Sequence, residues 1–246
     1  MKIYFHAFAM CQSMFCAIPF PVNIWDDEAR DKMLLFLPVV GLEIGSIWAG
    51  LAWICNLLNV PILVKGFILS VYPYLVTGFI HLDGYMDVTD AVKSYRSLER
   101  RREILKDSHV GAFAVIGIIM LLLVQFAVMA SANETANYWI LALVPAVSRC
   151  CSALAVTVLK PMNTSQYAEQ EKSQSHMVIL VSMTALIVIA GFLLCGRDGC
   201  VLLGCLAGYG AALRKAYKSL EGMNGDISGY ALSIAELCAV AVYALI

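Results

Sequence analysis

The chain has 246 residues, of which 61% are hydrophobic and 14% are charged, and its formal net charge at pH 7 is -1. Its mean hydropathy of +0.77 is well above that of an ordinary soluble domain. This composition excludes a soluble globular enzyme and offers no charge excess that would indicate nucleic-acid binding; it predicts an integral membrane protein.

Seven stretches are apolar and long enough for helices that cross a bilayer, which takes about 20 residues. They are 33–58, 60–80, 110–132, 138–159, 177–195, a short one at 199–213, and 230–246. Asn59 and Pro61 separate the first two stretches, which predicts a tight turn and a helical hairpin. Because no repeat or linker divides the chain, we expect one all-α domain over residues 1–246, a polytopic bundle of about seven transmembrane helices.

The basic residues predict the orientation of this bundle. With seven spans, most of the 17 lysine and arginine residues fall on one side, in the N-terminal segment, in the loop 81–109 and in later loops that include Lys172. Short cytoplasmic loops are enriched in Lys and Arg. We therefore place the N-terminus and the loop 81–109 in the cytoplasm and the C-terminus outside.

A polar stretch that begins at His81 follows the second span directly. Asp83, Asp87 and Asp90 would lie at i, i+4 and i+7 of a helix, so that their carboxylates share one face. Several acidic groups beside a membrane span favour a functional role. Carboxylates together with substrate phosphates are typical ligands of Mg²⁺, and the stretch therefore predicts a magnesium site.

The rest of this loop alternates in charge. A basic block from Arg96 to Arg102 precedes Glu103, Lys106 and Asp107, and Ser108 follows them. Basic groups beside carboxylate-bound Mg²⁺ suit phosphoryl transfer. A solvated helix with i, i+4 ion pairs, or a purely topological role for the arginines, remains the alternative.

Other polar groups interrupt the apolar segments. Four charged residues lie within the expected spans: Glu43, Lys65, Arg149 and Glu236. They should face the bundle interior, as functional groups or as ion pairs between helices. Asn224 and Asp226 lie before the last span, on the same expected side as the aspartates, where they either complete the site or only form a turn.

The order and spacing of these motifs resemble the cobalamin synthase family. The matching motifs are His81-Leu82-Asp83-Gly84-x-x-Asp87-x-x-Asp90, Glu103-Ile104-x-Lys106-Asp107-Ser108-x-x-Gly111, Ser148-Arg149, and Gly225-Asp226 with Glu236 downstream. Ile18-Pro19-Phe20-Pro21 and Pro38-x-x-Gly41-x-x-x-Gly45 resemble its N-terminal pattern. The chain departs from the pattern at Cys16-Ala17, Ala91, His109 and Met223-Asn224.

The resemblance implies a Mg²⁺-dependent enzyme of vitamin B12 synthesis in a bacterial or archaeal plasma membrane. The 5′-hydroxyl of α-ribazole, or of its 5′-phosphate, would attack adenosylcobinamide-GDP and release GMP. Partners would be these substrates and the lipid bilayer, with no nucleic acid and with self-association left open.

The resemblance also suggests roles for individual residues. Asp83, Asp87 and Asp90, with Glu103 or Asp107, would hold one or two Mg²⁺ ions. His81 or one aspartate such as Asp83 would accept the hydroxyl proton, and Lys106 and Arg149 would neutralise phosphate charge. The expected substrate contacts are Arg96, Ser108, Asn224, Asp226 and Glu236.

Three other functions are the alternatives for a membrane protein with these motifs. A CDP-alcohol phosphotransferase should carry a later Gly-x-x-x-Asp-x-x-x-Asp, which is absent here, and a prenyltransferase usually carries two comparable aspartate-rich loops. A secondary transporter would use the charges within the spans and should show inverted repeats. None of these patterns is visible in the sequence.

Overall fold

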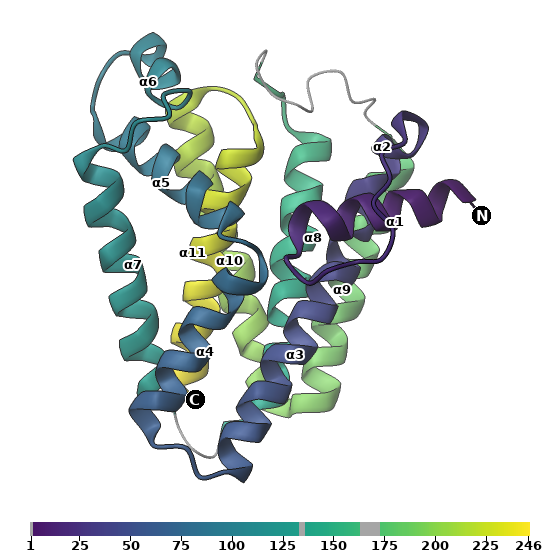
Figure 1. Cartoon of the computed structure of the whole chain (residues 1–246), viewed down its shortest axis with the longest axis vertical. Coiled ribbons are helices and arrows are strands. Elements are labelled where there is room, and N and C mark those ends of the chain that lie inside the picture. The colour runs from purple at the N-terminus through teal and green to yellow at the C-terminus, as the bar shows by residue number, and fades with distance from the viewer. Residues whose placement is uncertain (1, 133–135, 163–172) are drawn as a thin grey trace.

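The computed structural model describes residues 2–132, 136–162 and 173–246, and within these ranges the regular secondary structure is helical apart from one isolated β-bridge (Figure 1). The predicted all-α class is therefore confirmed. The helices are α1 (Lys2–Phe15), α2 (Asp27–Met33), α3 (Leu37–Leu57), α4 (Ile62–Val76), α5 (Ile80–Lys93), α6 (Leu98–Ile104), α7 (Ala112–Ala130), α8 (Val144–Val158), α9 (Gln174–Cys195), α10 (Cys200–Leu220) and α11 (Gly225–Leu245). Short 3₁₀ helices are η1 (Leu34–Phe36), η2 (Tyr138–Ala142) and η3 (Gly196–Gly199). The basic residue Lys172 lies outside the described ranges.

By length and apolar composition, the described part of the chain holds five helical segments that could cross a membrane, or six if the bent pair α4 and α5 counts as one. The five are Asp27–Leu57, Ala112–Ala130, Tyr138–Val158, Gln174–Leu220 and Gly225–Leu245. The chain is thus a multi-pass membrane protein.

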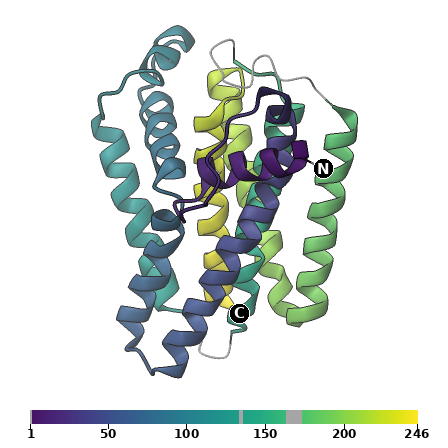
Figure 2. The ribbon, with the colours of Figure 1, turned by 45° about the vertical axis from the view of Figure 1, so that its right-hand side comes forward.

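Two places in the chain affect how the spans are counted. The 15 residues of α4 extend about 22 Å, which is shorter than the hydrocarbon core of about 30 Å. At Gly78 and Phe79, both with positive φ, the chain bends and α5 departs at 89°. The expected fifth and sixth spans lie in one helical run, Gln174–Leu220. Within it the chain reverses at Gly196, where φ is 60°, so that α9 and α10 run in opposite directions (Figure 2).

The predicted hairpin between α3 and α4 is present. Asn59 adopts a left-handed conformation with a φ of 50°, and Pro61 directly precedes α4. The indole nitrogen of Trp48 on α3 donates a hydrogen bond of 2.8 Å to the carbonyl oxygen of Leu69 on α4. This bond satisfies a buried polar group and joins the two helices.

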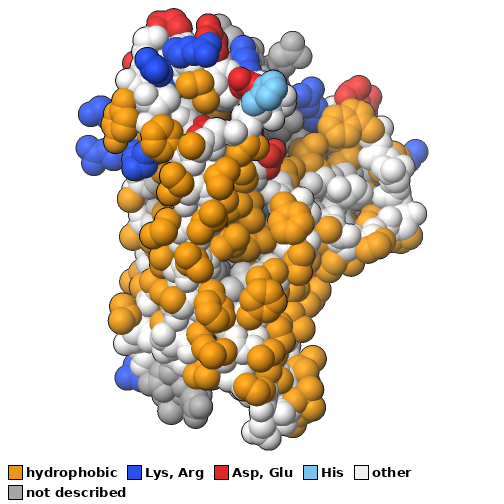
Figure 3. All heavy atoms as spheres, turned by 60° about the vertical axis from the view of Figure 1, so that its left-hand side comes forward, with side chains coloured by type: hydrophobic (Ala, Val, Ile, Leu, Met, Phe, Trp, Pro, Cys, Tyr) orange, Lys and Arg blue, Asp and Glu red, His pale blue; other side chains and the backbone are white. Residues whose placement is uncertain are grey.

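Polar and apolar side chains are segregated along the molecule. Figure 3 shows lysine, arginine, aspartate and glutamate side chains gathered toward one end, with a broad hydrophobic band below them. On α9 the buried residues are Leu180 and Gly191, while Leu186 and Leu193 are exposed. A helix that exposes leucines along its length is stable where lipid replaces water.

The N-terminal helix α1 lies across the other helices rather than along them (Figures 1 and 2). His6 Nδ1 is 2.5 Å from Asp26 Oδ2, just before α2, and Gln12 donates a hydrogen bond of 3.1 Å to Glu43 on α3. The hydrogen bond from His6 holds the pKa of Asp26 below its ordinary value. α1 is thereby tied to α2 and α3, and it covers the bundle near the start of α5.

Close packing of α3 against η2 and α8 depends on small residues. A Cβ atom at Gly45 would overlap the carbonyl oxygen of Ala142, and one at Gly41 would overlap that of Pro145. Small residues at four-residue spacing allow membrane helices to approach backbone to backbone. Gly50 lies on the same helix but has open space where its Cβ would be.

Gly45→Ala should therefore destabilise the protein, whereas Gly50→Ala should not. Overpacking at such a contact typically costs about 1–3 kcal/mol, while an exposed helical Gly→Ala change is neutral or stabilising. The thermal unfolding midpoint of the two purified variants in detergent measures the difference. Equal midpoints would contradict this account of the interface.

Candidate active site

The site is built where α5 and α11 meet. A Cβ at Gly84 would lie 2.8 Å from both the Cα and the carbonyl oxygen of Asp226, and one at Gly229 would lie 3.1 Å from the carbonyl oxygen of His81. Ser233 adds a hydrogen bond of 3.3 Å to that same carbonyl oxygen. The two backbones are therefore in direct contact, and the start of α11 lies against the face of α5 that carries the first two aspartates.

Three carboxylates, those of Asp83, Asp87 and Asp226, gather at this contact. Asp83, Asp226 and Asp90 all act unfavourably on the charge of Asp87, in that order of strength, and Asp83 acts on Asp226. In the part of the chain that the structure describes, no lysine or arginine forms an ion pair with Asp83, Asp87 or Asp226. Uncompensated carboxylates of this kind attract a cation.

Asp90 has a different partner from the other two aspartates of α5. Its Oδ2 accepts a hydrogen bond of 2.5 Å from the backbone N–H of Gly111, and its Oδ1 accepts one of 2.9 Å from Ala114. These donors belong to the start of α7, where helical N–H groups lack partners within the helix. Asp90 therefore caps α7, although its charge still acts on Asp87.

The second acidic pair lies apart from this cluster. Glu103 forms an ion pair of 2.6 Å with Arg100, with both side chains exposed. Asp107 accepts hydrogen bonds from the backbone and ring of His109, at 3.0 and 2.7 Å, which lower its pKa. Among the described residues, no group of three or more His, Cys, Asp or Glu side chains is arranged to hold a metal ion by itself.

The basic block has a structural role that the sequence did not indicate. Arg101 donates a hydrogen bond of 2.9 Å to the carbonyl oxygen of Ser219, and Arg102 donates bonds of 3.0 and 2.9 Å to those of Leu220 and Glu221. These acceptors lie at the C-terminus of α10, where carbonyl groups lack helical partners. The arginines therefore fix α6 against α10.

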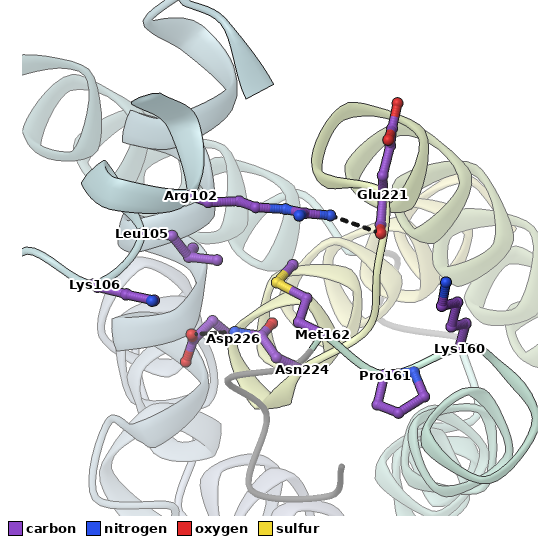
Figure 4. A pocket seen from close by; sticks show the side chains of 9 residues that line it. All are labelled: Arg102, Leu105, Lys106, Lys160, Pro161, Met162, Glu221, Asn224 and Asp226. Atoms are coloured by element: carbon purple, nitrogen blue, oxygen red, sulfur yellow. Dashed lines mark hydrogen bonds between the residues drawn. The ribbon is translucent and has the colours of Figure 1, made fainter. Parts of the chain in front are cut away.

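A polar hollow of about 820 Å³ opens between α6 and the start of α11 (Figure 4). Lys106 and Lys160 stand on opposite sides of it, and Asn224 and Asp226 lie between them. The amide nitrogen of Asn224 donates a hydrogen bond of 2.6 Å to Asp226, and its oxygen accepts one of 3.0 Å from the backbone of Ile227. Asn224 thus caps α11 and orients the Asp226 carboxylate at the edge of a basic hollow.

Lys160 is a candidate site residue that the sequence pattern does not indicate. The segment after α8 pairs with the turn before α11: Met162 N–H donates to the carbonyl of Met223, and Met223 N–H to that of Lys160, each at 2.9 Å. This bridge brings Lys160 beside Asn224. A lone lysine after an apolar span carries no sequence signal of such a pairing.

Two further hollows lie beside the carboxylates. One, of about 240 Å³, shares Asp226 with the basic hollow and also contacts His81 and Asp83. The other, of about 520 Å³, is bounded by Asp83, Cys16 and Ala17, where the chain departs from the resembled pattern. Asp83 and Asp226 therefore stand at the junction of the three hollows, whereas Asp87 and Asp90 line none of them.

Several predicted site residues are not brought into this junction. Arg149 and Glu236 form a buried ion pair of 2.8 Å between α8 and α11, and Ser148 donates a second bond of 2.8 Å to the same glutamate oxygen. Arg96 and Ser108 are exposed and line none of the three hollows. Of the two alternatives for Arg149 and Glu236, the geometry favours the ion pair between helices.

Comparison with known proteins gives one family over nearly the whole chain. The sequence profile of the family described as cobalamin-5-phosphate synthase matches residues 7–244. An adenosylcobinamide-GDP ribazoletransferase of Clostridium perfringens is 36% identical over the full length of both chains. Proteins of that description from Clostridium botulinum and Clostridioides difficile are 34% and 27% identical, covering 96% and 89% of this chain and 96% and 90% of their own lengths. No solved structure matches.

Asp90→Ala should lower stability through the loss of the cap on α7. Removing an N-cap acceptor costs about 0.5–2 kcal/mol, so the thermal unfolding midpoint in detergent should fall. Glu103→Gln, which removes one charge from an exposed pair, should leave the midpoint unchanged because such pairs contribute little. An unchanged midpoint for Asp90→Ala would show that its hydrogen bonds to α7 do not support the fold.

Proposed function

The chain belongs to the cobalamin-5-phosphate synthase family, and we propose that its adenosylcobinamide-GDP ribazoletransferase activity takes place where α5, α6 and α11 meet. The observation that carries this assignment is a basic hollow of about 820 Å³ that is lined by Asp226, whose charge interacts with those of Asp83 and Asp87. Small-molecule sites typically have volumes of about 300–1,000 Å³, and a nucleoside diphosphate needs both basic groups and a cation. The activity belongs to nucleotide-loop assembly in B12 synthesis.

The reaction joins two substrates. The 5′-oxygen of α-ribazole, or of its 5′-phosphate, attacks the cobinamide-side phosphorus of adenosylcobinamide-GDP. A new phosphorus–oxygen bond forms as the bond to the bridging oxygen breaks, and GMP leaves. The hydroxyl proton passes to a base beside the acceptor, for which Asp83, Asp226 and His81 are the candidates at the junction of the hollows.

The guanosine diphosphate is assigned to the basic hollow. Lys106 and Lys160 stand on two sides of it and neither forms an ion pair with another described residue (Figure 4). Their ammonium groups are therefore available for phosphate oxygens. Arg102 also lines this hollow, but its guanidinium already donates hydrogen bonds to backbone carbonyl groups at the end of α10.

The residues present fit a Mg²⁺ site that is completed by substrate. Mg²⁺ usually takes one or two carboxylates and fills its other positions with water and phosphate oxygens, so a preformed group of three ligands is not required. Asp83 and Asp87 are the proposed ligands, with Asp226 beside them. When bound, Mg²⁺ would neutralise charge on the diphosphate.

The site is proposed to face the cytoplasm. The basic residues of α6 and of the α10 terminus lie at the end of the bundle that carries the carboxylates. The opposite end holds Arg197, which donates a hydrogen bond of 2.9 Å to the C-terminal Ile246. A basic excess at one end of a multi-pass protein is typical of its cytoplasmic face.

A direct assay tests the activity and its dependence on Mg²⁺. Purified protein in detergent or vesicles, supplied with adenosylcobinamide-GDP, α-ribazole and Mg²⁺, should release GMP and form a complete cobalamin. Chelation of Mg²⁺ should stop the reaction, and added Mg²⁺ should restore it. Absence of GMP release from well-folded wild-type protein would refute the assignment.

Asp87→Asn should lower kcat by at least about a hundredfold, the scale expected when a group that organises transition-state charge is lost. Its thermal unfolding midpoint should not fall, because removing one of several mutually repelling carboxylates relieves repulsion. Glu103→Gln is the matched control, since this carboxylate is exposed and paired with Arg100. Full activity of Asp87→Asn, or an equal loss in Glu103→Gln, would exclude the proposed ligand set.

A further inference from the structure

The turn between α3 and α4 holds a hollow of about 430 Å³, at the end of the molecule opposite α6 (Figure 1). Its lining residues are Cys55, Asn56, Asn59, Val60, Ile62 and Lys65. None of them lines the three hollows around the carboxylates. Any role of this hollow is therefore separate from the proposed reaction.

Lys65 supplies the charge of this hollow, and it is one of the four charged residues within the expected spans. Its ammonium group donates a hydrogen bond of 2.7 Å to the amide oxygen of Asn56, which ties the start of α4 to the end of α3. An ammonium group has three N–H donors, and Lys65 forms no ion pair with another described residue. Donors therefore remain for an anion.

The other polar groups of the lining are also suited to an anion. The amide nitrogen of Asn56 has no hydrogen-bond partner among the described residues, and Asn59 adds a second amide. α4 begins at the hollow without a side-chain cap, so its first N–H groups are also unpaired within the helix. Because no acidic side chain is among the lining residues, this set of donors fits a phosphate group.

The turn that forms the hollow is held in place by its neighbours. The backbone N–H of Val60 donates a hydrogen bond of 2.9 Å to the carbonyl oxygen of Cys55. A Cβ at Gly66 would lie 2.7 Å from the Cβ of Ala130, so the first turns of α4 lie directly against the end of α7. A ligand would thus enter a preformed site, which reduces the entropy lost on binding.

The surface around the hollow is apolar. Leu57 and Leu58 at the end of α3 are 63% and 66% exposed, and Leu63 in the first turn of α4 is 64% exposed. Trp53, one turn earlier on α3, is exposed as well. Exposed leucines at a turn are favourable in lipid and costly in water, and tryptophan is enriched where a bilayer meets water. The turn therefore belongs at the level of the lipid headgroups.

We propose that this hollow binds the phosphate of a phospholipid headgroup, while the acyl chains lie along the exposed apolar residues of α3 and α4. The phosphate complements Lys65 and the neighbouring N–H donors. The apolar rim favours a lipid over a soluble anion. A bound lipid would join the α3–α4 turn to the leaflet opposite the carboxylates, an interaction that goes beyond the proposed function.

The test titrates purified full-length protein in detergent with palmitoyl-oleoyl phosphatidylglycerol and measures bound lipid by native mass spectrometry. The thermal unfolding midpoint should rise with lipid, because a ligand that binds only the folded state stabilises it. Lys65→Gln should weaken lipid binding at least about tenfold, the factor expected when a hydrogen bond to a charged group is lost. Arg197→Gln is the matched control and should bind as wild type does, since Arg197 contacts the C-terminal residue at the same end but does not line the hollow.

Equal lipid binding by wild type and Lys65→Gln would overturn the inference, and so would an equal loss in Arg197→Gln. Diacylglycerol with the same acyl chains lacks the phosphate, so equal stabilisation by it would also refute the site. An equal rise of the midpoint with inorganic phosphate alone would make the hollow a site for soluble anions and exclude the lipid.

A second variant applies if Lys65→Gln does not fold. Asn59→Gly removes one amide of the lining and keeps the turn, because the φ of 50° at this position is readily adopted by glycine. It should bind phosphatidylglycerol more weakly than wild type. Unchanged binding in Asn59→Gly would then refute the inference.

Discussion

The direct backbone contact between α5 and α11 determines the geometry of the rest of the site. Gly84 allows α5 to touch the first turn of α11 at Asp226, and Gly229 allows α11 to touch α5 at His81. A side chain at either position would separate the helices and with them the carboxylates. The contact brings like charges together, which is unfavourable in the absence of a cation. The energy that holds this arrangement must come from packing elsewhere along α5 and α11.

Part of that support lies in the bundle core. The buried ion pair of Arg149 and Glu236 joins α8 to α11, and Ser148 donates a further hydrogen bond to the glutamate. Gly41 on α3 lies against the Arg149 side chain, so three helices meet at this pair. Breaking such a pair would leave a charge unpaired in a medium that solvates it poorly. The pair therefore restrains the position of α11, and through it the position of Asp226.

The arrangement also suits a reaction between a large amphipathic corrinoid and a small nucleoside. In the proposed function, a nucleotide would bind in a polar hollow from the aqueous side, and the bulky part of the substrate would remain near the membrane surface. The basic hollow of about 820 Å³ and the hollow of about 240 Å³ both reach Asp226.

The sequence by itself determined the all-α membrane class, the α3–α4 hairpin and the acidic motif on α5, because apolar length, turn residues and helical spacing are local properties. Only the tertiary structure decided the partners of that motif. Spacing along one helix predicts a shared face, but it does not reveal which distant segment packs there: Asp83 and Asp87 meet Asp226, whereas Asp90 caps α7. The position of Lys160 likewise follows from a backbone bridge between distant segments. These pairings depend on how closely two backbones can approach, a property of the packed bundle and not of either segment alone.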